Sequence, residues 1–332
     1  MVSPGNTCRW MTRARDLWYD REMTPPQPLV DQFQRRISYL RLSVTDRCEL
    51  QQLALGFIAR GVTKIRLTGG EPLVRRDMIE LVRALGRQIG QGLEELTLTT
   101  NGTRLAEFAD DLAAAGVRRV NVSLDTLDRG RFAELTRRDS LPKVLEGLAA
   151  AREAGLQVKI NTVALKDANE HELPDLIAWA HSQQFDLTLI EVMPLGEVEA
   201  DRFDQYLALD AVRAALGTRF TLNPSPHRSG GPARYFDVAE TGGRLGLITP
   251  LTNNFCEGCN RVRVTATGQL YACLGGTEQV DLRAALRSDD PETQLAFALG
   301  EAMRIKPERH HFAIRAAGAE PALARHMSLT GG

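Results

Sequence analysis

The chain has 332 residues, of which 43% are hydrophobic and 25% are charged, as in an ordinary globular enzyme. Its formal net charge of −1 gives no general attraction to nucleic acid or to an anionic membrane. No apolar run is long enough for a membrane span, and the first 22 residues lack the apolar core of a signal peptide. Five cysteines, three of them clustered, indicate a cytoplasmic protein with a metal site rather than a disulfide framework.

After an expected loose arm (1–30, with Met23 as a candidate translation start), short β-branched runs alternate with helical patterns. The predicted strands are 39–45, 63–68, 94–100, 117–125, 156–164 and 186–193, and the predicted helices are 49–60, 77–89, 103–115, 142–154 and 171–184. Six βα units in this order predict parallel strands joined by right-handed crossovers. Residues 221–244 are rich in Pro, Gly and Ser, which is typical of a linker or a meander.

The predicted strands alternate between apolar and polar residues, although parallel strands covered on both faces are usually continuously apolar. Leu40 and Leu42, for example, flank Arg41. Because side chains alternate with period two, each strand has one polar face. An ordinary sheet with one solvated face would explain this, but agreement among five strands favours a full or partial barrel. Its interior would then be polar, and Arg41, Arg66 and Lys159 would make it electropositive.

Two strand ends carry residues suited to chemistry. "SVTDRCELQQLALGF" (43–57) passes from a strand into a helix with almost no loop and with a single cysteine, Cys48. "TGGEP" (68–72) places two glycines, which allow close backbone approach, beside a carboxylate. Alone, the second motif is typical of a strand-ending turn.

A cysteine loop lies near the end of the chain, in "FCEGCNRVRVTATGQLYAC". Cys256 and Cys259 have metal-ligand spacing, and antiparallel pairing of the two strands that follow would place Cys273 opposite Arg261. Three thiolates suit a 4Fe–4S cluster with one open iron. Zinc would need a fourth ligand, such as the distant His227 or His310.

Arg261 and Arg263 share one face of a strand beside this loop. Two fixed guanidinium groups suit phosphate or the acceptor edge of a guanine. With the three basic residues of the barrel, they predict a pocket for a nucleoside triphosphate. "MSLTGG" at the end of the chain has the composition of a flexible tail.

A series of motifs then occurs in order between about residue 31 and residue 332: "YLRLSVTDRC", "KIRLTGGEPLVRRD", "LTTNG", "RRVNVSLD", "VKINTV", "IEVMP", the cysteine loop and the terminal "GG". Together they closely resemble the molybdenum cofactor biosynthesis protein A family, the radical S-adenosylmethionine GTP 3′,8-cyclases. The resemblance implies an α/β fold, a partial TIM barrel of six βα units (31–220), followed by a C-terminal iron–sulfur cluster and GTP-binding region (221–332). It also implies two 4Fe–4S clusters, one of which cleaves S-adenosylmethionine to a radical that attacks GTP.

By motif position, the resemblance assigns residues to each site. GTP contacts are expected from Arg41, Arg66, Thr99, Lys159, Arg261 and Arg263, and S-adenosylmethionine contacts from Gly70, Ser123 and Met193. Cys256, Cys259 and Cys273 should hold the second cluster, and the terminal glycines should reach into the active site. Thr188 stands where the family often has arginine, so one GTP contact is expected to be missing.

The first cluster is where this sequence departs from the family. The family has a C-x3-C-x2-C loop beginning at the position of Cys48, followed by a further segment, whereas this chain continues directly into a helical pattern. Two of three radical-cluster cysteines are absent, and one thiolate does not hold a cubane. We therefore expect this chain to be inactive as a cyclase, with Cys48 as the remnant of the first cluster site.

Two other interpretations remain open: a non-catalytic GTP- and iron–sulfur-binding remnant, and a zinc-stabilised structural or nucleic-acid module. The near-neutral charge and the polar barrel interior argue against the second. The resemblance further implies a cytoplasmic enzyme, a homodimer, an electron donor that the sequence does not identify, and transfer of product to the next enzyme of the pterin pathway.

Overall fold

The computed structural model describes residues 26–44, 49–193, 204–252, 255–310 and 327–330. The strands are β1 (Tyr39–Ser43), β2 (Lys64–Thr68), β3 (Glu95–Thr100), β4 (Arg119–Ser123), β5 (Gln157–Ala164), β6 (Asp186–Glu191), β7 (Leu222–Pro224), β8 (Arg234–Val238), β9 (Arg244–Ile248), β10 (Arg261–Val264), β11 (Gln269–Tyr271) and β12 (Gln279–Asp281). The helices are α2 (Glu49–Ile58), α3 (Met78–Gly86), α4 (Leu105–Ala114), α5 (Arg129–Thr136), α6 (Leu141–Glu153), α7 (Leu173–Ser182), α8 (Leu209–Leu216), α9 (Leu282–Leu286), α10 (Pro291–Arg304) and α11 (Met327–Thr330).

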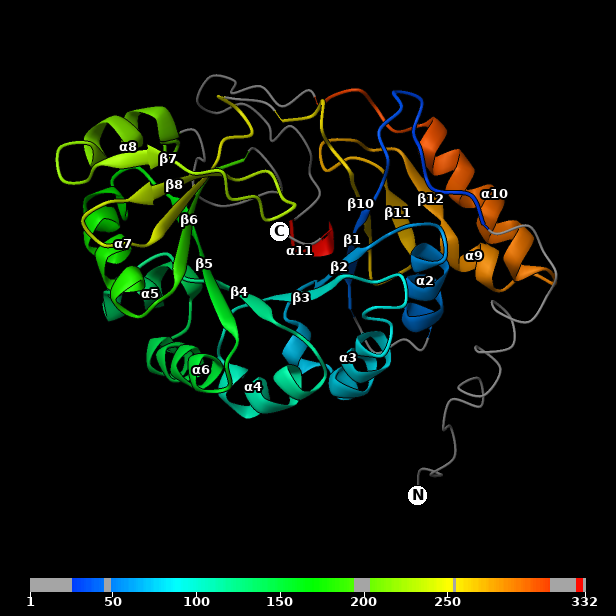
Figure 1. Cartoon of the computed structure of the whole chain (residues 1–332), viewed down its shortest axis with the longest axis horizontal. Coiled ribbons are helices and arrows are strands. Elements are labelled where there is room, and N and C mark those ends of the chain that lie inside the picture. Colours follow the sequence, from blue (N-terminus) through cyan, green and yellow to red (C-terminus); the bar gives the residue numbers. More distant parts are fainter. Residues whose placement is uncertain (1–25, 45–48, 194–203, 253–254, 311–326, 331–332) are drawn as a thin grey trace.

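All twelve of these strands belong to one curved sheet in the order β12-β11-β10-β1-β2-β3-β4-β5-β6-β9-β8-β7. Strands β1 to β6 are parallel neighbours, as the βα pattern predicts. Strand β10 adds to β1 and strand β9 adds to β6, so the C-terminal third of the chain extends both edges of the barrel. The barrel does not close, which confirms the predicted partial TIM barrel (Figure 1).

The alternation of the strands separates a hydrophobic outer face from a polar inner face. Leu40, Leu42, Ile65 and Leu67 are completely buried and belong to the core. Helices α3, α4, α6 and α7 lie outside the curved sheet and cover this face (Figure 1). The polar residues lie on the inner face of the curved sheet, as the barrel interpretation predicts, and not on an open face as in a flat solvated sheet.

Two features of the fold differ from the prediction or extend it. Helix α5 was not predicted because it buries only Phe132, and helix α8 was not predicted either. Residues 221–244 form the meander option, since strands β7, β8 and β9 pair antiparallel in sequence. The proposed boundary at residue 220 stays a prediction, because strands from both sides of it share one sheet.

The shortened join between the first strand and the first helix lies mostly outside the described residues. Strand β1 ends at Ser43 and helix α2 begins at Glu49, while Cys48 falls in the undescribed range 45–48. A join this short leaves little chain for a turn and could loosen this edge of the barrel, but β1 is hydrogen-bonded on both sides, to β2 and to β10. Glu49 also forms an ion pair with Arg287 at 2.6 Å, which attaches the start of α2 to the C-terminal region. Within the ranges described, no helix is both long and apolar enough to cross a bilayer.

Glu191, at the end of β6, fixes the loop that leads to the cysteines. Its fully buried carboxylate accepts hydrogen bonds from Leu209 N (3.2 Å), Leu251 N (3.1 Å), and Thr252 N and Oγ1 (3.3 and 2.5 Å). Replacing it by glutamine leaves some of these buried donors unpaired, which costs about 1–3 kcal/mol. We therefore expect Glu191→Gln to lower the urea midpoint of the chain. The exposed control Glu134→Gln should leave it unchanged, and equal midpoints for the two variants would contradict the assignment.

Candidate functional site

A cavity inside the barrel collects most of the basic residues singled out in the sequence. Five basic side chains line it: Arg41, Arg66, Lys159, Arg261 and Arg263. No Asp or Glu is among its lining residues in the part of the chain described. The strand register explains part of this charge density, because Arg66, Arg41 and Arg263 are direct cross-strand neighbours on β2, β1 and β10. Neighbouring strands lie about 4.8 Å apart, so three positive charges stand in one row.

These cations perturb one another. Burial, together with Arg263 and Arg66, holds the pKa of Arg41 well below its usual value. Burial and the nearby Arg66 and Arg119 lower the pKa of Lys159 to about 7. Such mutual repulsion among buried cations is unfavourable, and an anion bound among them would relieve it.

Several buried polar atoms on the inner face have no hydrogen-bond partner among the described residues. They include Tyr39 OH, Arg66 Nε and Thr99 Oγ1. Thr99 does not line the cavity itself, although it lies on the neighbouring strand β3. Buried groups without partners are costly in a native protein unless a ligand or water satisfies them. Together with the charge, this indicates a polar ligand.

Lys159 is held by a tyrosine that the sequence did not single out. Its Nζ donates to Tyr235 OH at 2.7 Å, and Tyr235 OH donates to Ser229 Oγ at 2.9 Å. Tyr235 lies on β8, so the meander that follows the barrel positions a lysine on β5. Nothing in the spacing of the sequence points to this contact.

The three C-terminal cysteines line the same cavity. The strand register pairs Arg263 with Tyr271 and Val264 with Leu270. Extended by two residues, this register agrees with the predicted pair of Arg261 with Cys273, although Cys273 lies beyond the end of β11. Burial raises the pKa of the Cys259 thiol, but the positive charges of Lys306 and Arg261 outweigh this effect and bring the pKa down to about 7. Because the thiolate is the form that binds metal, this charge environment fits a metal or cluster ligand.

A zinc site would need His227 or His310 as a fourth ligand, so the positions of these two histidines bear on the choice between zinc and a 4Fe–4S cluster. His227 accepts from Arg244 Nη1 at 2.9 Å and packs against Tyr235, and it does not line the cavity of the cysteines. His310 does line it. Among the described residues, no three Cys, His, Asp or Glu side chains meet as ligands of a single metal ion. Three thiols around a shared cavity fit the donor set of a cubane, whose irons lie apart from one another.

The residues assigned to S-adenosylmethionine lie at the carboxyl ends of parallel strands. Ser123 ends β4, Gly70 follows β2 and Met193 follows β6. Gly69 has a φ of +124°, and a Cβ there would come within 3.2 Å of Val44 N, so the turn needs glycine. In open α/β sheets the carboxyl ends of the strands are where ligands bind.

The C-terminal helix α11 lies inside the barrel (Figure 1). Ser43 Oγ donates to Leu329 O at 3.0 Å, and Arg263 Nη1 donates to Thr330 O at 3.0 Å. Residues 327–330 therefore form a short helix that contacts β1 and β10, where composition predicts a flexible tail, and the approach of the terminal glycines to the active site stays a prediction. Gly331 and Gly332 lie outside the described residues.

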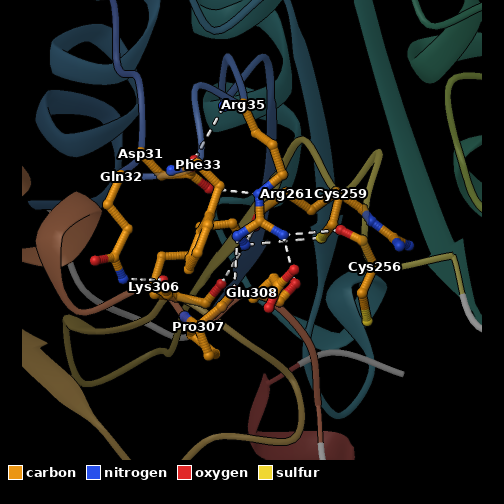
Figure 2. Close-up of polar contacts among 11 residues, drawn as sticks. Asp31, Gln32, Phe33, Arg35, Cys256, Cys259, Arg261, Lys306, Pro307 and Glu308 are labelled. Atoms are coloured by element: carbon orange, nitrogen blue, oxygen red, sulfur yellow. Dashed lines mark hydrogen bonds and ion pairs between the residues drawn. The ribbon is translucent and has the colours of Figure 1, made fainter.

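Two basic residues beneath the cysteines were missed by the sequence analysis. Arg35 donates to Cys256 O at 2.8 Å, and Lys306 donates to Cys259 Sγ at 3.7 Å (Figure 2). Arg35 belongs to the pair Arg35-Arg36 and Lys306 stands alone, and neither lies in a motif, so no signal in the sequence distinguishes them from surface charges.

Comparison with known proteins identifies relatives along the whole described core. Residues 32–180 match the Radical SAM superfamily and residues 185–312 match the family described as Molybdenum Cofactor Synthesis C. Proteins named GTP 3′,8-cyclase are similar to this chain: the one from Erythrobacter litoralis is 65% identical over 92% of this chain and 98% of its own length. The one from Rhizobium meliloti is 55% identical over 93% and 96%.

The same alignments show that this chain is shorter internally than its relatives. The Erythrobacter alignment spans 328 positions and uses 92% of the 332 residues here, which is about 305. About 23 positions of the alignment are therefore occupied by residues of the relative and by no residue of this chain.

Solved structures share the fold. Streptococcus suis SuiB bound to S-adenosylmethionine superposes with a TM-score of 0.56 and 15% identity, over 82% of this chain and 69% of that one. AnSMEcpe with bound AdoMet and Cp18Cys peptide superposes with a TM-score of 0.50 and 13% identity, over 79% and 83%.

Proposed function

Because this chain belongs to the GTP 3′,8-cyclases of molybdenum cofactor biosynthesis, a family of radical S-adenosylmethionine enzymes, we propose that its electropositive cavity binds GTP. The observation that carries the proposal is the row of Arg66, Arg41 and Arg263, completed by Arg261 and Lys159. Guanidinium groups bind phosphate through paired hydrogen bonds, and a triphosphate neutralises several charges at once. Thr99 Oγ1, which is buried without a partner among the described residues, is proposed as a further polar contact.

We propose that Cys256, Cys259 and Cys273 hold a 4Fe–4S cluster at one wall of this cavity. The support is their shared cavity and the charge environment of Cys259. A cluster held by these three thiolates would leave one iron without a protein thiolate, and that iron could bind GTP. The chain's own residues would orient the nucleotide, because Arg261 and Arg263 lie on β10, directly after Cys259, and line the same cavity as the cysteines.

Members of the radical S-adenosylmethionine superfamily use a second cluster of this kind to cleave S-adenosylmethionine, and the residues for it do not fit here. Of the three cysteines of the family loop, the sequence retains only Cys48. The absence of about 23 aligned positions supports loss of one segment at this join. We therefore propose that Gly70, Ser123 and Met193 are the remaining parts of an S-adenosylmethionine site that lacks its cluster, and that this chain makes no radical.

The alternative to an active cyclase is a protein that binds GTP and an iron–sulfur cluster without catalysis. A chain that keeps the GTP cavity and the C-terminal cysteines is a GTP- and iron–sulfur-binding protein without turnover. The cytoplasm as its location, a homodimer, an electron donor and transfer of product to the next enzyme of the pterin pathway are proposed from family membership alone.

Anaerobic reconstitution of the 332-residue chain with iron and sulfide tests these proposals together. After addition of dithionite, S-adenosylmethionine and GTP, we expect GTP binding by calorimetry but no 5′-deoxyadenosine by chromatography. Formation of 5′-deoxyadenosine would show that the first cluster has found other ligands. Absence of GTP binding would refute the assignment of the cavity.

Lys159 predicts how GTP affinity depends on pH. Its pKa of about 7 means that the ammonium deprotonates as the pH rises above 7, and bound triphosphate would raise this pKa. Binding therefore takes up a proton above pH 7, and affinity should fall by up to about tenfold per pH unit between pH 7.5 and 9. Lys159→Met should bind GTP more weakly but with a flatter pH profile. Parallel profiles for the two proteins would contradict this role.

The same shift affects the stability of the ligand-free fold in the opposite sense. The folded pKa of Lys159 lies below its unfolded value of 10.5, so the unfolded chain binds more protons between about pH 7 and pH 10. This group alone therefore makes the empty protein more stable as the pH rises through that window, while GTP binding weakens.

A further inference from the structure

Lys306, just after helix α10, is a buried lysine with no ion pair to an Asp or Glu in the described parts of the chain. The residue is 1% exposed. Asp31 is near enough to act on it electrostatically, but the carboxylate of Asp31 is ion-paired with Arg35 at 2.6 Å. Because a buried charge is costly unless an opposite charge balances it, the thiol groups of the cysteine loop are the other candidates to balance this ammonium group.

The three donors of the ammonium group all point to the cysteine loop. Nζ donates to Arg261 O at 2.9 Å, to Ala272 O at 2.6 Å and to Cys259 Sγ at 3.7 Å. An ammonium has three N–H groups, so its hydrogen-bonding capacity is used completely. Arg261 opens β10 and Ala272 directly precedes Cys273, so one side chain connects the segments that carry Cys259 and Cys273.

Residues of the N-terminal segment hold Lys306 and the remaining cysteine, Cys256, in place. Arg35 donates to Cys256 O at 2.8 Å, and to Pro307 O and Glu308 O at 2.7 Å each (Figure 2). Gln32 Nε2 donates to Lys306 O at 3.0 Å. The N-terminal segment 31–35 thus joins the carbonyl of Cys256 to the backbone around Lys306.

We propose that Lys306 is a positioning residue of the C-terminal cluster, whose ammonium group holds the Cys259 sulfur and supplies the positive charge that the cluster and its thiolates balance. This inference rests on the proposed cluster. Positive charge and N–H donors next to cluster sulfur stabilise the reduced, more negative state and therefore raise the reduction potential. The arginines line the cavity proposed for GTP, whereas Lys306 does not line it, so its ammonium group contacts the cysteine loop rather than the nucleotide site.

The test compares Lys306→Met, which keeps the length of the side chain but not the charge, with wild type and with Lys143→Met on the exposed face of α6. All three are reconstituted anaerobically, and the cluster is titrated with dithionite and redox mediators. We expect K306M to reduce at a more negative potential, by about tenfold in the equilibrium constant, or about 59 mV for one electron. It should also lose iron to a chelator at least several-fold faster. Lys143→Met should match wild type in both measurements.

Each outcome separates this inference from the proposal beneath it. If wild type takes up no iron and sulfide, the proposed cluster fails. If wild type holds a cluster and K306M shows the same potential and the same rate of iron loss, Lys306 has only a structural role and the inference is overturned. Should K306M fail to fold by circular dichroism, the wild-type protein carries the test. With ¹⁵Nζ-labelled lysine, pulsed electron paramagnetic resonance of the reduced cluster should detect a ¹⁵N coupling, and its absence would overturn the inference.

Discussion

Inserting between Cys48 and Glu49 a segment that carries the two missing cysteines of the family's C-x3-C-x2-C loop should allow the chain to cleave S-adenosylmethionine. The parent chain should give only background 5′-deoxyadenosine, and the graft more than one turnover per chain. The physical reason is ligand count, since a cubane needs three thiolates and the parent supplies one at this position. The rest of the barrel is prepared for it, because β1 and α2 are already packed on either side of the join.

The matched control is the same graft with the inserted cysteines changed to serine, which restores chain length without ligands. It should remain at background while it folds and binds GTP as the graft does. Activity in the serine graft would mean that the segment acts through loop closure rather than through the cluster. A graft that holds two clusters per chain and still makes no 5′-deoxyadenosine would show that the defect lies elsewhere.

Removing one cation from the arginine row should change binding and stability in opposite directions. Arg66→Met should weaken GTP binding about 10- to 100-fold, because a hydrogen bond to a charged group is worth about 1.5–3 kcal/mol. The empty protein should become more stable by about 1 kcal/mol, since repulsion from Arg41 is relieved. The substitution also removes the stacking of Arg66 on Tyr39, whose ring centroid lies 5.6 Å from the guanidinium carbon of Arg66. The expected gain in stability already subtracts this loss.

Calorimetry for GTP and urea unfolding without ligand measure the two effects. Arg118→Met, which removes an exposed arginine from the chain, should change neither by a comparable amount. A variant that loses stability and keeps its GTP affinity would show that Arg66 is a structural residue. An unchanged stability would mean that the register places the charges side by side without bringing their ends together.

The barrel could be predicted from sequence because its signal is local. Each of five predicted strands alternates with period two, so the polar barrel interior with Arg41, Arg66 and Lys159 was predictable. The register of the hairpin that leads to Cys273 was also predictable, because the connection between β10 and β11 is short and its turn fixes the register.

The remaining contacts depend on pairings between distant segments. No local pattern specifies that β10 lies beside β1, and that pairing alone turns two arginines into a row of three. Lys306 and Tyr235 were missed for the same reason, since each acts through a contact with a strand far away in the chain. Helix α5 has too narrow an apolar face to be distinguished from a polar loop.

The pairing of β1 with β10 also determines when the barrel is completed during synthesis. More than 200 residues separate these strands, whereas β6 waits for only about 55 residues before β9 follows it. At about 5–20 residues per second, translation leaves the outer edge of β1 without its partner for roughly 10–45 s. An unpaired edge strand is a template for pairing with other chains. The outer edge of β1 is therefore open to pairing with other chains until the segment that follows the cysteine loop has been synthesised.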